Sequence, residues 1–290
     1  MPTLIDALAQ QTQQQFAVVL ALNNTSDNSR ETIAYACDRH PDLKIFVDEV
    51  SFEPAEAHAG SARRRAMELA ADLAGPEGLI LTTDADTRPP WDWLAQNIAA
   101  MARGLDIVGG RIVVDEAEPL LNEIATARQL ADRYWARVRD IEDAIDPIAW
   151  DLPPRHGDHT GASICVTVSA YRRAGGVPPI PSGEDRALVR AIVRQGGRLA
   201  HPAGIWTRVS PRLEGRAIGG MAEHMNRLHK DVATSTDVML PSFAQWRARA
   251  EWRRAMRAKG GASLIAELED DLPAMVCDLA LTDHALDTAL

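Results

Sequence analysis

Two aspartates spaced one residue apart follow an apolar run in the first third of the chain. The run Leu79 to Leu81 predicts a buried strand, and Asp84-Ala85-Asp86 comes just after it. In extended backbone, residues i and i+2 point to the same side, so both carboxylates can be aimed at one point beyond the strand. Hard cations such as Mg²⁺ or Mn²⁺ prefer oxygen ligands, and a cation held by one or two carboxylates keeps positions for substrate phosphates. The spacing therefore predicts a divalent-cation site at Asp84 and Asp86.

A solvated turn is the alternative, since a chain with 41 acidic residues among 290 contains Asp-x-Asp by chance. The flanking sequence favours the cation site. An apolar strand precedes the pair, and Pro89-Pro90 followed by Trp93 and Leu94 predicts a helix start with an apolar face. The segment does not fit an EF-hand loop, because the turn glycine and the bidentate glutamate are missing.

The composition narrows the classes of function. A formal charge of −10 and a pI near 5.3 argue against a nucleic-acid surface, where a basic patch is expected. The three cysteines are far apart and lack CxxC spacing, which excludes a disulfide framework and a zinc site. The absence of an apolar run of about 18 residues and of a signal peptide predicts a soluble cytoplasmic protein.

The hydrophobic pattern alternates between strands and helices. Helices are expected around residues 33–37, 63–73, 120–145, 168–174 and 184–195, and strands at 16–22, 43–47, 78–81, 107–114, 163–167 and 205–209. Such alternation predicts an α/β fold with a mostly parallel sheet flanked by helices. Residues after Gly215 are expected to be helical, so the chain divides into a domain over 1–230 and a helical extension over 231–290. Residues 151–159 form a Pro-rich loop over the ligand end of the sheet.

Three polar clusters fall at the predicted ends of strands or just before a helix. They are Asn24 to Asp27, Asp84 to Asp86, and the loop that leads into Glu184 and Asp185. Open α/β sheets bind ligands beyond the carboxyl ends of their strands, so the three clusters are expected to converge.

This order of elements resembles the family 2 glycosyltransferases of the GT-A fold, which is Rossmann-like. The resemblance runs through most of residues 2–225 and rests on four motifs, at 11–27, at 84–86, at 160–163 with 171–176, and at 184–188. It implies transfer of a sugar from a nucleoside diphosphate sugar to an acceptor hydroxyl, usually with inversion. The acceptor would be a glycan, a lipid-linked molecule or a small molecule.

The resemblance also implies roles for particular residues. Asp84 and Asp86 would hold the metal, Asp185 with Glu184 beside it would supply the catalytic base, and the donor would be bound by Asn24, Asp27, Arg63, Asp84, Arg212 and Arg216.

Each of these roles has a structural alternative. Asn24 and Asp27 fit Asx turns, Arg63 fits a solvated helix face, Asp185 fits a helix-capping charge, and Arg212 and Arg216 fit salt bridges. In some relatives a late histidine is a further metal ligand, which points to His201 or His224, although a satisfied or exposed histidine is favoured for each.

The chain departs from the family pattern in two places. It begins one element late, at Pro2-Thr3-Leu4, so the first strand of the family is expected to be missing. A misassigned start, a substituting segment and impaired activity all stay open as explanations. The Gln-x-x-Arg-Trp motif of processive members is also absent, which favours single transfer.

The sequence also bears on two rival functions and on a basic segment near the C-terminus. A sugar-phosphate nucleotidyltransferase would need a Gly-rich phosphate loop near the N-terminus, which is not present. A binding subunit without turnover would fit the missing strand. The basic segment 243–259, with Trp246 and Trp252, either lies on anionic lipid as a peripheral membrane contact or packs on the domain, and packing is favoured.

Overall fold

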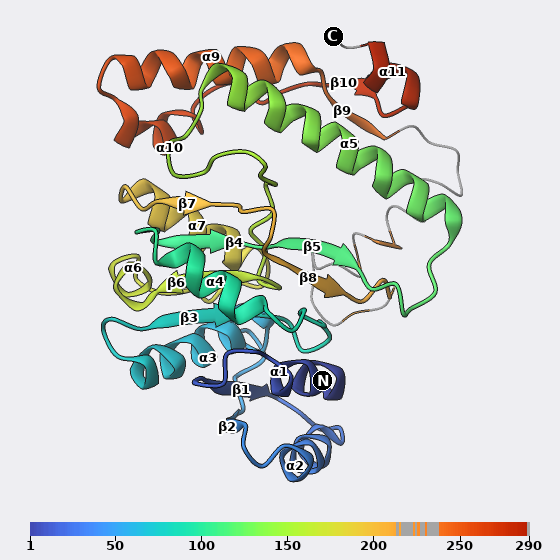
Figure 1. Ribbon diagram of the computed structural model, residues 1–290, viewed down its shortest axis with the longest axis vertical. Helices are drawn as coiled ribbons and strands as arrows, with labels where there is room; N and C mark the ends of the chain where they lie inside the picture. The colour runs from blue at the N-terminus through green and yellow to red at the C-terminus, as the bar shows by residue number, and fades with distance from the viewer. Residues whose placement is uncertain (213–214, 216–222, 224, 227–229, 231–237, 289–290) are drawn as a thin grey trace.

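The computed structural model describes residues 1–212, 215, 223, 225–226, 230 and 238–288 (Figure 1). Its central sheet has four strands in the order β3 (Leu79–Thr82), β6 (Ile164–Thr167), β4 (Ile107–Gly109) and β7 (Leu199–Ala200). β6 runs antiparallel to both of its neighbours, whereas β4 and β7 are parallel. The carboxyl ends of β3, β4 and β7 therefore lie along the same edge.

Three two-stranded ladders accompany this sheet. β1 (Ala17–Asn23) is parallel to β2 (Lys44–Val50), β5 (Arg111–Val114) is parallel to β8 (Trp206–Val209), and β9 (Met239–Pro241) is antiparallel to β10 (Cys277–Ala280). The α/β class is confirmed, but the described sheet is mixed rather than mostly parallel. After β5 the chain makes a long excursion and returns through the middle of the sheet as β6, from the opposite direction.

Helices cover both faces of the central sheet because successive strand residues point to opposite sides. On one face, Ile80, Ile107 and Val166 pack against α3 (Ala59–Ala74), α6 (Val168–Arg173) and α7 (Glu184–Arg194). On the other face, the strand residues Leu79, Leu81, Val108 and Cys165 pack against α1 (Pro2–Ala9) and α4 (Trp93–Met101). The strand side chains that alternate along the sequence thus supply two separate cores.

Within the described residues, the other helices are α2 (Ser29–Arg39), α5 (Asn122–Ile145), α9 (Phe243–Ala258), the 3₁₀ turn η1 (Ala262–Leu264), α10 (Ile265–Leu268) and α11 (Asp283–Thr288). α5 and α9 lie side by side at one end of the molecule (Figure 1). There the indole N–H of Trp246 donates to the hydroxyl of Tyr134 at 2.6 Å. Trp246 therefore packs on the protein, and within the described residues none of the helices has the length and apolarity needed to cross a bilayer.

Two further expectations are wrong. The region after Gly215 is not wholly helical, because it contains β9 and β10, whose short length hides them in the sequence pattern. Residues 107–114 form two strands rather than one, with the break at Gly110. A Cβ there would lie 2.0 Å from Ser163 Oγ, so the close approach of the two chain segments requires glycine.

The part of the fold that contains β1, β2 and β3 consists of two sheets that are not joined to each other. Among the described strands, β1 pairs with β2 and β3 pairs with β6, and no ladder joins β1 to β3. The apolar core is nevertheless continuous across this interval, because Leu4 and Leu8 of α1 pack in one cluster with Val18 of β1 and Leu79 of β3.

Candidate active site

The carboxylate turn follows β3 at the edge where the parallel strands end. Thr87 holds the turn closed, since its backbone N–H and its hydroxyl both donate to the Asp84 carbonyl, at 3.2 and 2.9 Å. Thr87 itself is fully buried, whereas the side chains of Asp84 and Asp86 are 42% and 32% exposed. The turn thus fixes the backbone and presents both carboxylates at the surface.

Arg63 of α3 connects this turn to the start of α7. Its Nε donates to Glu184 at 2.9 Å and one terminal nitrogen donates to Asp84 at 2.8 Å. The other terminal nitrogen donates to the carbonyl of Gly161 at 2.9 Å. Burial alone would lower the pKa of Arg63, but the two carboxylates raise it above its ordinary value, so the guanidinium stays charged.

The solvated-face alternative is wrong for Arg63 and right for its neighbour. The Arg63 side chain is 18% exposed, whereas that of Arg65 is 46% exposed and pairs with Asp48 at 2.6 Å. Arg63 and Arg65 are two positions apart on the helix and therefore point about 200° apart around its axis, so they cannot both face the site.

Gly161 connects Arg63 to Asp185. Its N–H donates to Asp185 Oδ2 at 2.7 Å, and its carbonyl also accepts from the hydroxyl of Thr82 at 2.8 Å. A Cβ at Gly161 would lie 2.3 Å from Cζ of Arg63, so no other residue fits here without displacing that arginine. Glu184 is buried against Arg63, whereas the half-buried Asp185 faces the loop around Gly161.

The residues predicted after β1 are engaged with other parts of the protein, Asn24 over a long range and Asp27 in a local turn. The side-chain amide of Asn24 donates to the Phe52 carbonyl and its oxygen accepts from the Phe52 N–H, each at 2.9 Å. Asp27 accepts from the N–H of Ser29 at 3.1 Å. The bond of Asp27 corresponds to the Asx-turn alternative, whereas Asn24 instead links the end of β1 to Phe52, 28 residues away. The preceding Asn23, which the sequence places at the start of this polar turn without assigning it a role, has a buried Oδ1 with no hydrogen-bond partner within the described part of the chain.

Of the two predicted phosphate-binding arginines, Arg212 is described and Arg216 lies outside the described residues, as does His224. Arg212 pairs with Asp86 at 2.6 Å, which is the salt-bridge alternative. Oδ1 of Asp84 pairs with Arg63, and Oδ2 of Asp86 pairs with Arg212. In each carboxylate the second oxygen lies outside these ion pairs. Among the described side chains, no three His, Cys, Asp or Glu groups are gathered closely enough to hold a metal unaided. The donor set fits a hard cation that takes its remaining ligands from a substrate.

A row of buried polar side chains lies at the far end of the same sheet edge. His201 follows β7, and its Nδ1 lies 2.9 Å from Asp151 Oδ2. Its Nε2 lies 3.2 Å from Nδ1 of His159. Burial lowers the pKa of His159 to about 4 and that of the adjacent His156 to about 3. Sequence analysis places Asp151 and His159 only in a loop, without assigning them a role.

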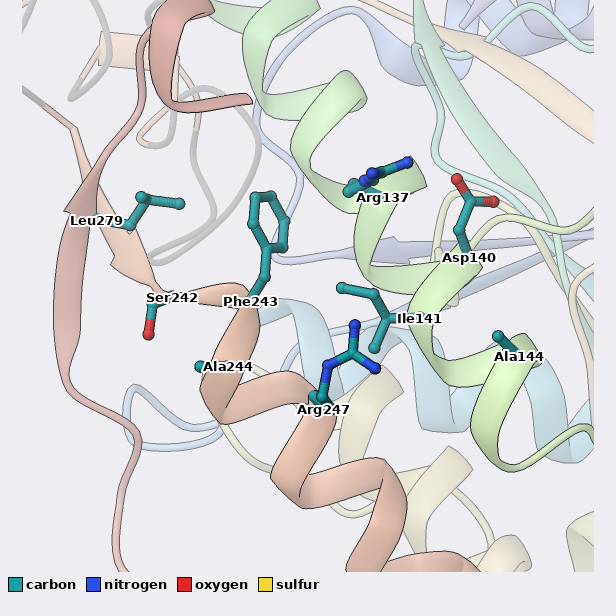
Figure 2. Close-up of a pocket in the computed structure, with 9 residues that line it drawn as sticks. All are labelled: Arg137, Asp140, Ile141, Ala144, Ser242, Phe243, Ala244, Arg247 and Leu279. Carbon is teal, nitrogen blue, oxygen red and sulfur yellow. The ribbon is translucent and has the colours of Figure 1, made fainter. Parts of the chain in front are cut away.

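A cavity of about 470 Å³ lies elsewhere, between α5 and α9 (Figure 2). Arg137, Asp140 and Ile141 line it from α5, and Phe243 and Arg247 line it from α9. None of the predicted site residues contributes to it. The chemistry-bearing residues lie at the sheet edge instead.

Comparison with known proteins identifies the family of the chain. The model of the family described as glycosyl transferase family 2 matches residues 1–151, which is more than half of the chain. The chain belongs to this family. It is therefore a glycosyltransferase, and the activity of the family is sugar transfer from a nucleotide sugar to an acceptor.

One similar solved structure is the mannosyltransferase PcManGT from Pyrobaculum calidifontis in complex with GDP-Man and Mn²⁺. The two chains share 15% identity with a TM-score of 0.50, over 92% of this glycosyltransferase and 73% of that chain. At this identity the likeness supports the GT-A fold alone. A comparison with curated protein sequences finds no match.

Proposed function

We propose that this glycosyltransferase carries out a single, metal-dependent sugar transfer with inversion at the anomeric carbon. The donor is a nucleoside diphosphate sugar and the acceptor contributes a hydroxyl. Residues 1–230 would carry the reaction, with 231–290 as an extension. Non-processive transfer is proposed because the Gln-x-x-Arg-Trp motif of processive members is absent from the sequence.

The observation that carries the proposal is the bridge made by Arg63. One guanidinium binds Asp84 of the carboxylate turn and Glu184 at the start of α7, so one proposed metal ligand and the residue next to the proposed base are held by a single group. Glu184 then acts through Arg63 as a positioning residue. Arg63, whose Nε and both terminal nitrogens already bind protein atoms, is proposed to orient the donor site through Asp84.

Asp185 is proposed as the general base. The Gly161 N–H donates to Oδ2 at 2.7 Å, which limits rotation of the carboxylate. An acceptor hydroxyl within hydrogen-bond reach would lose its proton to Asp185 as its oxygen attacks the anomeric carbon. A single displacement of this kind inverts the configuration.

Asp84 and Asp86 would hold the divalent cation. Such a cation supplies Lewis-acid neutralisation of the charge that develops on the diphosphate leaving group. Arg212, whose side chain is 55% exposed, would exchange Asp86 for a donor phosphate, because a guanidinium binds phosphate in a bidentate manner. This exchange would free Asp86 Oδ2 as well.

The test uses a panel of sugar nucleotides in which the nucleoside diphosphate is UDP, GDP or dTDP. Purified protein is incubated with Mn²⁺ and methyl hexosides as acceptors, and nucleoside diphosphate and pyrophosphate are both quantified. We expect nucleoside diphosphate from the wild type and a loss of at least about 100-fold in Asp185→Asn. The exposed Asp38→Asn on α2 is the matched control. Pyrophosphate as the product would instead identify a nucleotidyltransferase, and full turnover by Asp185→Asn would refute the base assignment.

A binding subunit without turnover is the second candidate. The separation between β1 and β3 favours it, since unpaired strand edges beside a nucleotide pocket leave backbone groups without partners. Calorimetry with each nucleoside diphosphate and Mn²⁺ distinguishes the two candidates. Binding without release of nucleoside diphosphate from any donor would support the subunit, and turnover would exclude it.

A further inference from the structure

β2 is a strand with an open edge, at the end of the molecule opposite to α5 and α9 (Figure 1). Among the described strands it pairs only with β1. Two large apolar side chains of β2 are exposed, Phe46 at 47% and Val47 at 48%. Because successive strand residues point to opposite faces, both faces of the strand present apolar surface to solvent here. An open edge of this kind is a template for pairing with another strand.

The ladder between β1 and β2 determines which backbone groups of β2 face outward. The Val50 carbonyl accepts from the N–H of Asn24 at 3.0 Å, so the backbone groups of Val50 point toward β1. The backbone groups of successive strand residues point alternately to the two sides, so every second residue back from Val50 also points toward β1. Ile45 and Val47 therefore present their N–H and C=O groups at the open edge.

Charged side chains stand on either side of Phe46 along one face of β2. Lys44 and Asp48 are each two residues from Phe46, so the three side chains share a face. Asp48 pairs with Arg65 of α3 at 2.6 Å. Lys44 is exposed and forms no ion pair within the part of the chain that the structure describes. Positive, apolar and negative side chains thus follow one another, an order that is complementary to its own reverse.

A two-fold axis at Phe46 gives the register in which two copies of β2 match. Antiparallel pairing about such an axis sets each residue opposite the one equally far beyond the axis. Phe46 then lies opposite Phe46 of the second copy, and Ile45 lies opposite Val47. Lys44 lies opposite Asp48 in both halves of the pair. An axis at Val47 would instead set Phe46 opposite Asp48, and an axis at Ile45 would set Lys44 opposite Phe46.

We propose that β2 pairs with β2 of a second copy of this chain in antiparallel orientation, which joins the two ladders into one sheet in the order β1-β2-β2-β1. The outward groups of Ile45 and Val47 supply the hydrogen bonds between the copies. Phe46 occupies the closer, non-hydrogen-bonded pair at the axis. Two pairs of Lys44 with Asp48 flank this apolar centre. The partner of the open edge is a second copy because the edge is complementary to itself.

Charge variants test both the association and its register, by sedimentation equilibrium from about 5 to 500 µM. Lys44→Asp and Asp48→Lys each set like charges opposite one another, so each should raise the dimer Kd about tenfold. Mixing the two variants restores opposite charges at both positions and should give a mixed dimer with the wild-type Kd. Asp140→Lys, on an exposed position of α5 at the other end of the molecule, is the control. A wild type that is monomeric throughout, or a dimer that neither variant weakens, would overturn the inference.

Disulfide cross-linking locates the axis. In a non-hydrogen-bonded pair the Cα atoms lie about 4.5 Å apart, within the range of a disulfide. Phe46→Cys should therefore give a covalent dimer on mild oxidation, in a background of Cys37→Ser and Cys277→Ser that removes the two cysteines that are not buried. Ile45→Cys is the matched control, because the two copies of residue 45 would lie about 7–8 Å apart across the pair. Equal cross-linking at the two positions, or none at residue 46, would contradict the proposed pairing.

Discussion

The Arg63 network at the carboxylate turn and the Glu142 network between α5 and α9 are both built from arginine and carboxylate. Glu142 accepts from Arg139, Arg155 and Arg253, at 3.0, 3.3 and 2.8 Å. Its side chain is 7% exposed and that of Arg155 is 6% exposed. The carboxylate of this network is closed off by protein, and its pairs join α5 to α9 and to the loop before β6.

The network at the turn is closed on only one side. Arg63 and Glu184 are largely buried, but Asp84 and Asp86 keep substantial exposure on the side away from Arg63. Removing charges from water is costly unless partners replace the lost solvation, and the buried carboxylates Glu142 and Glu184 are each paired with arginine. The difference in exposure indicates which carboxylates a ligand can reach. Asp84 and Asp86 can replace solvent with a substrate, whereas a ligand could reach Glu142 only by breaking the contacts that join α5 to α9.

The largest effect is expected from Arg63→Ala, which removes the only arginine that the structure shows bonded to the buried Glu184 among the described residues. An uncompensated buried charge costs about 3–5 kcal/mol in the free energy of unfolding, measured by urea denaturation. Arg65→Ala on the same helix is the control, with an expected loss below about 1 kcal/mol because its pair with Asp48 is exposed. Adding Glu184→Gln should restore part of the stability. Equal losses at Arg63 and Arg65 would contradict the comparison.

Asp86→Asn should leave the fold intact and weaken donor binding. The pair with Arg212 is exposed, so the free energy of unfolding should change by less than about 1 kcal/mol. Affinity for a nucleoside diphosphate with Mn²⁺ should fall about 100-fold, or about 2.7 kcal/mol, by calorimetry. Chelating the cation should produce a similar loss in the wild type and little further loss in the variant. Glu116→Gln, which breaks an exposed pair with Arg208, should change neither quantity.

Much of the turn could be predicted from the sequence because its signals are local. The apolar run before Asp84, the prolines after it and the acidic start of α7 each lie within a few residues of what they specify. The direction of β6 could not be predicted, since a hydrophobic pattern of period two is the same read either way. The burial of Arg63 and the pairing of His159 with His201 depend on partners 121 and 42 residues away, respectively.

Glu142→Gln tests the closed network. Loss of the charge weakens the bonds from its arginines, but Arg253 keeps Glu269 at 2.6 Å and Arg155 keeps Asp143 at 2.7 Å. We therefore expect a loss of about 2 kcal/mol in the free energy of unfolding. Turnover per folded molecule should stay at the wild-type level, in contrast to Asp86→Asn. A matching loss of turnover would show that the closed network also shapes the site.

The smallest effect concerns the histidines, which adjoin the Glu142 network because Asp151 pairs both with His201 and, at 3.5 Å, with Arg155. The pKa of His156 falls from 6.5 to about 3, mainly through burial and then through the charges of His201 and Arg111, with Asp151 opposing. Between these two pKa values the unfolded chain binds a proton that the folded protein does not. Stability should therefore fall as the pH is lowered below 6.5, by up to about 1.4 kcal/mol per pH unit for this histidine.

Urea denaturation at pH 7, 6 and 5 measures this slope, and His156→Asn is the informative variant. Asparagine keeps an acceptor near the position of Nδ1, which accepts from the Asp158 N–H at 3.1 Å, but it does not titrate. The slope between pH 6.5 and 5 should be shallower in the variant by about one proton, while His159, whose pKa of about 4 lies in the same direction, continues to contribute. An unchanged slope would mean that His156 is protonated in the folded protein, contrary to its burial.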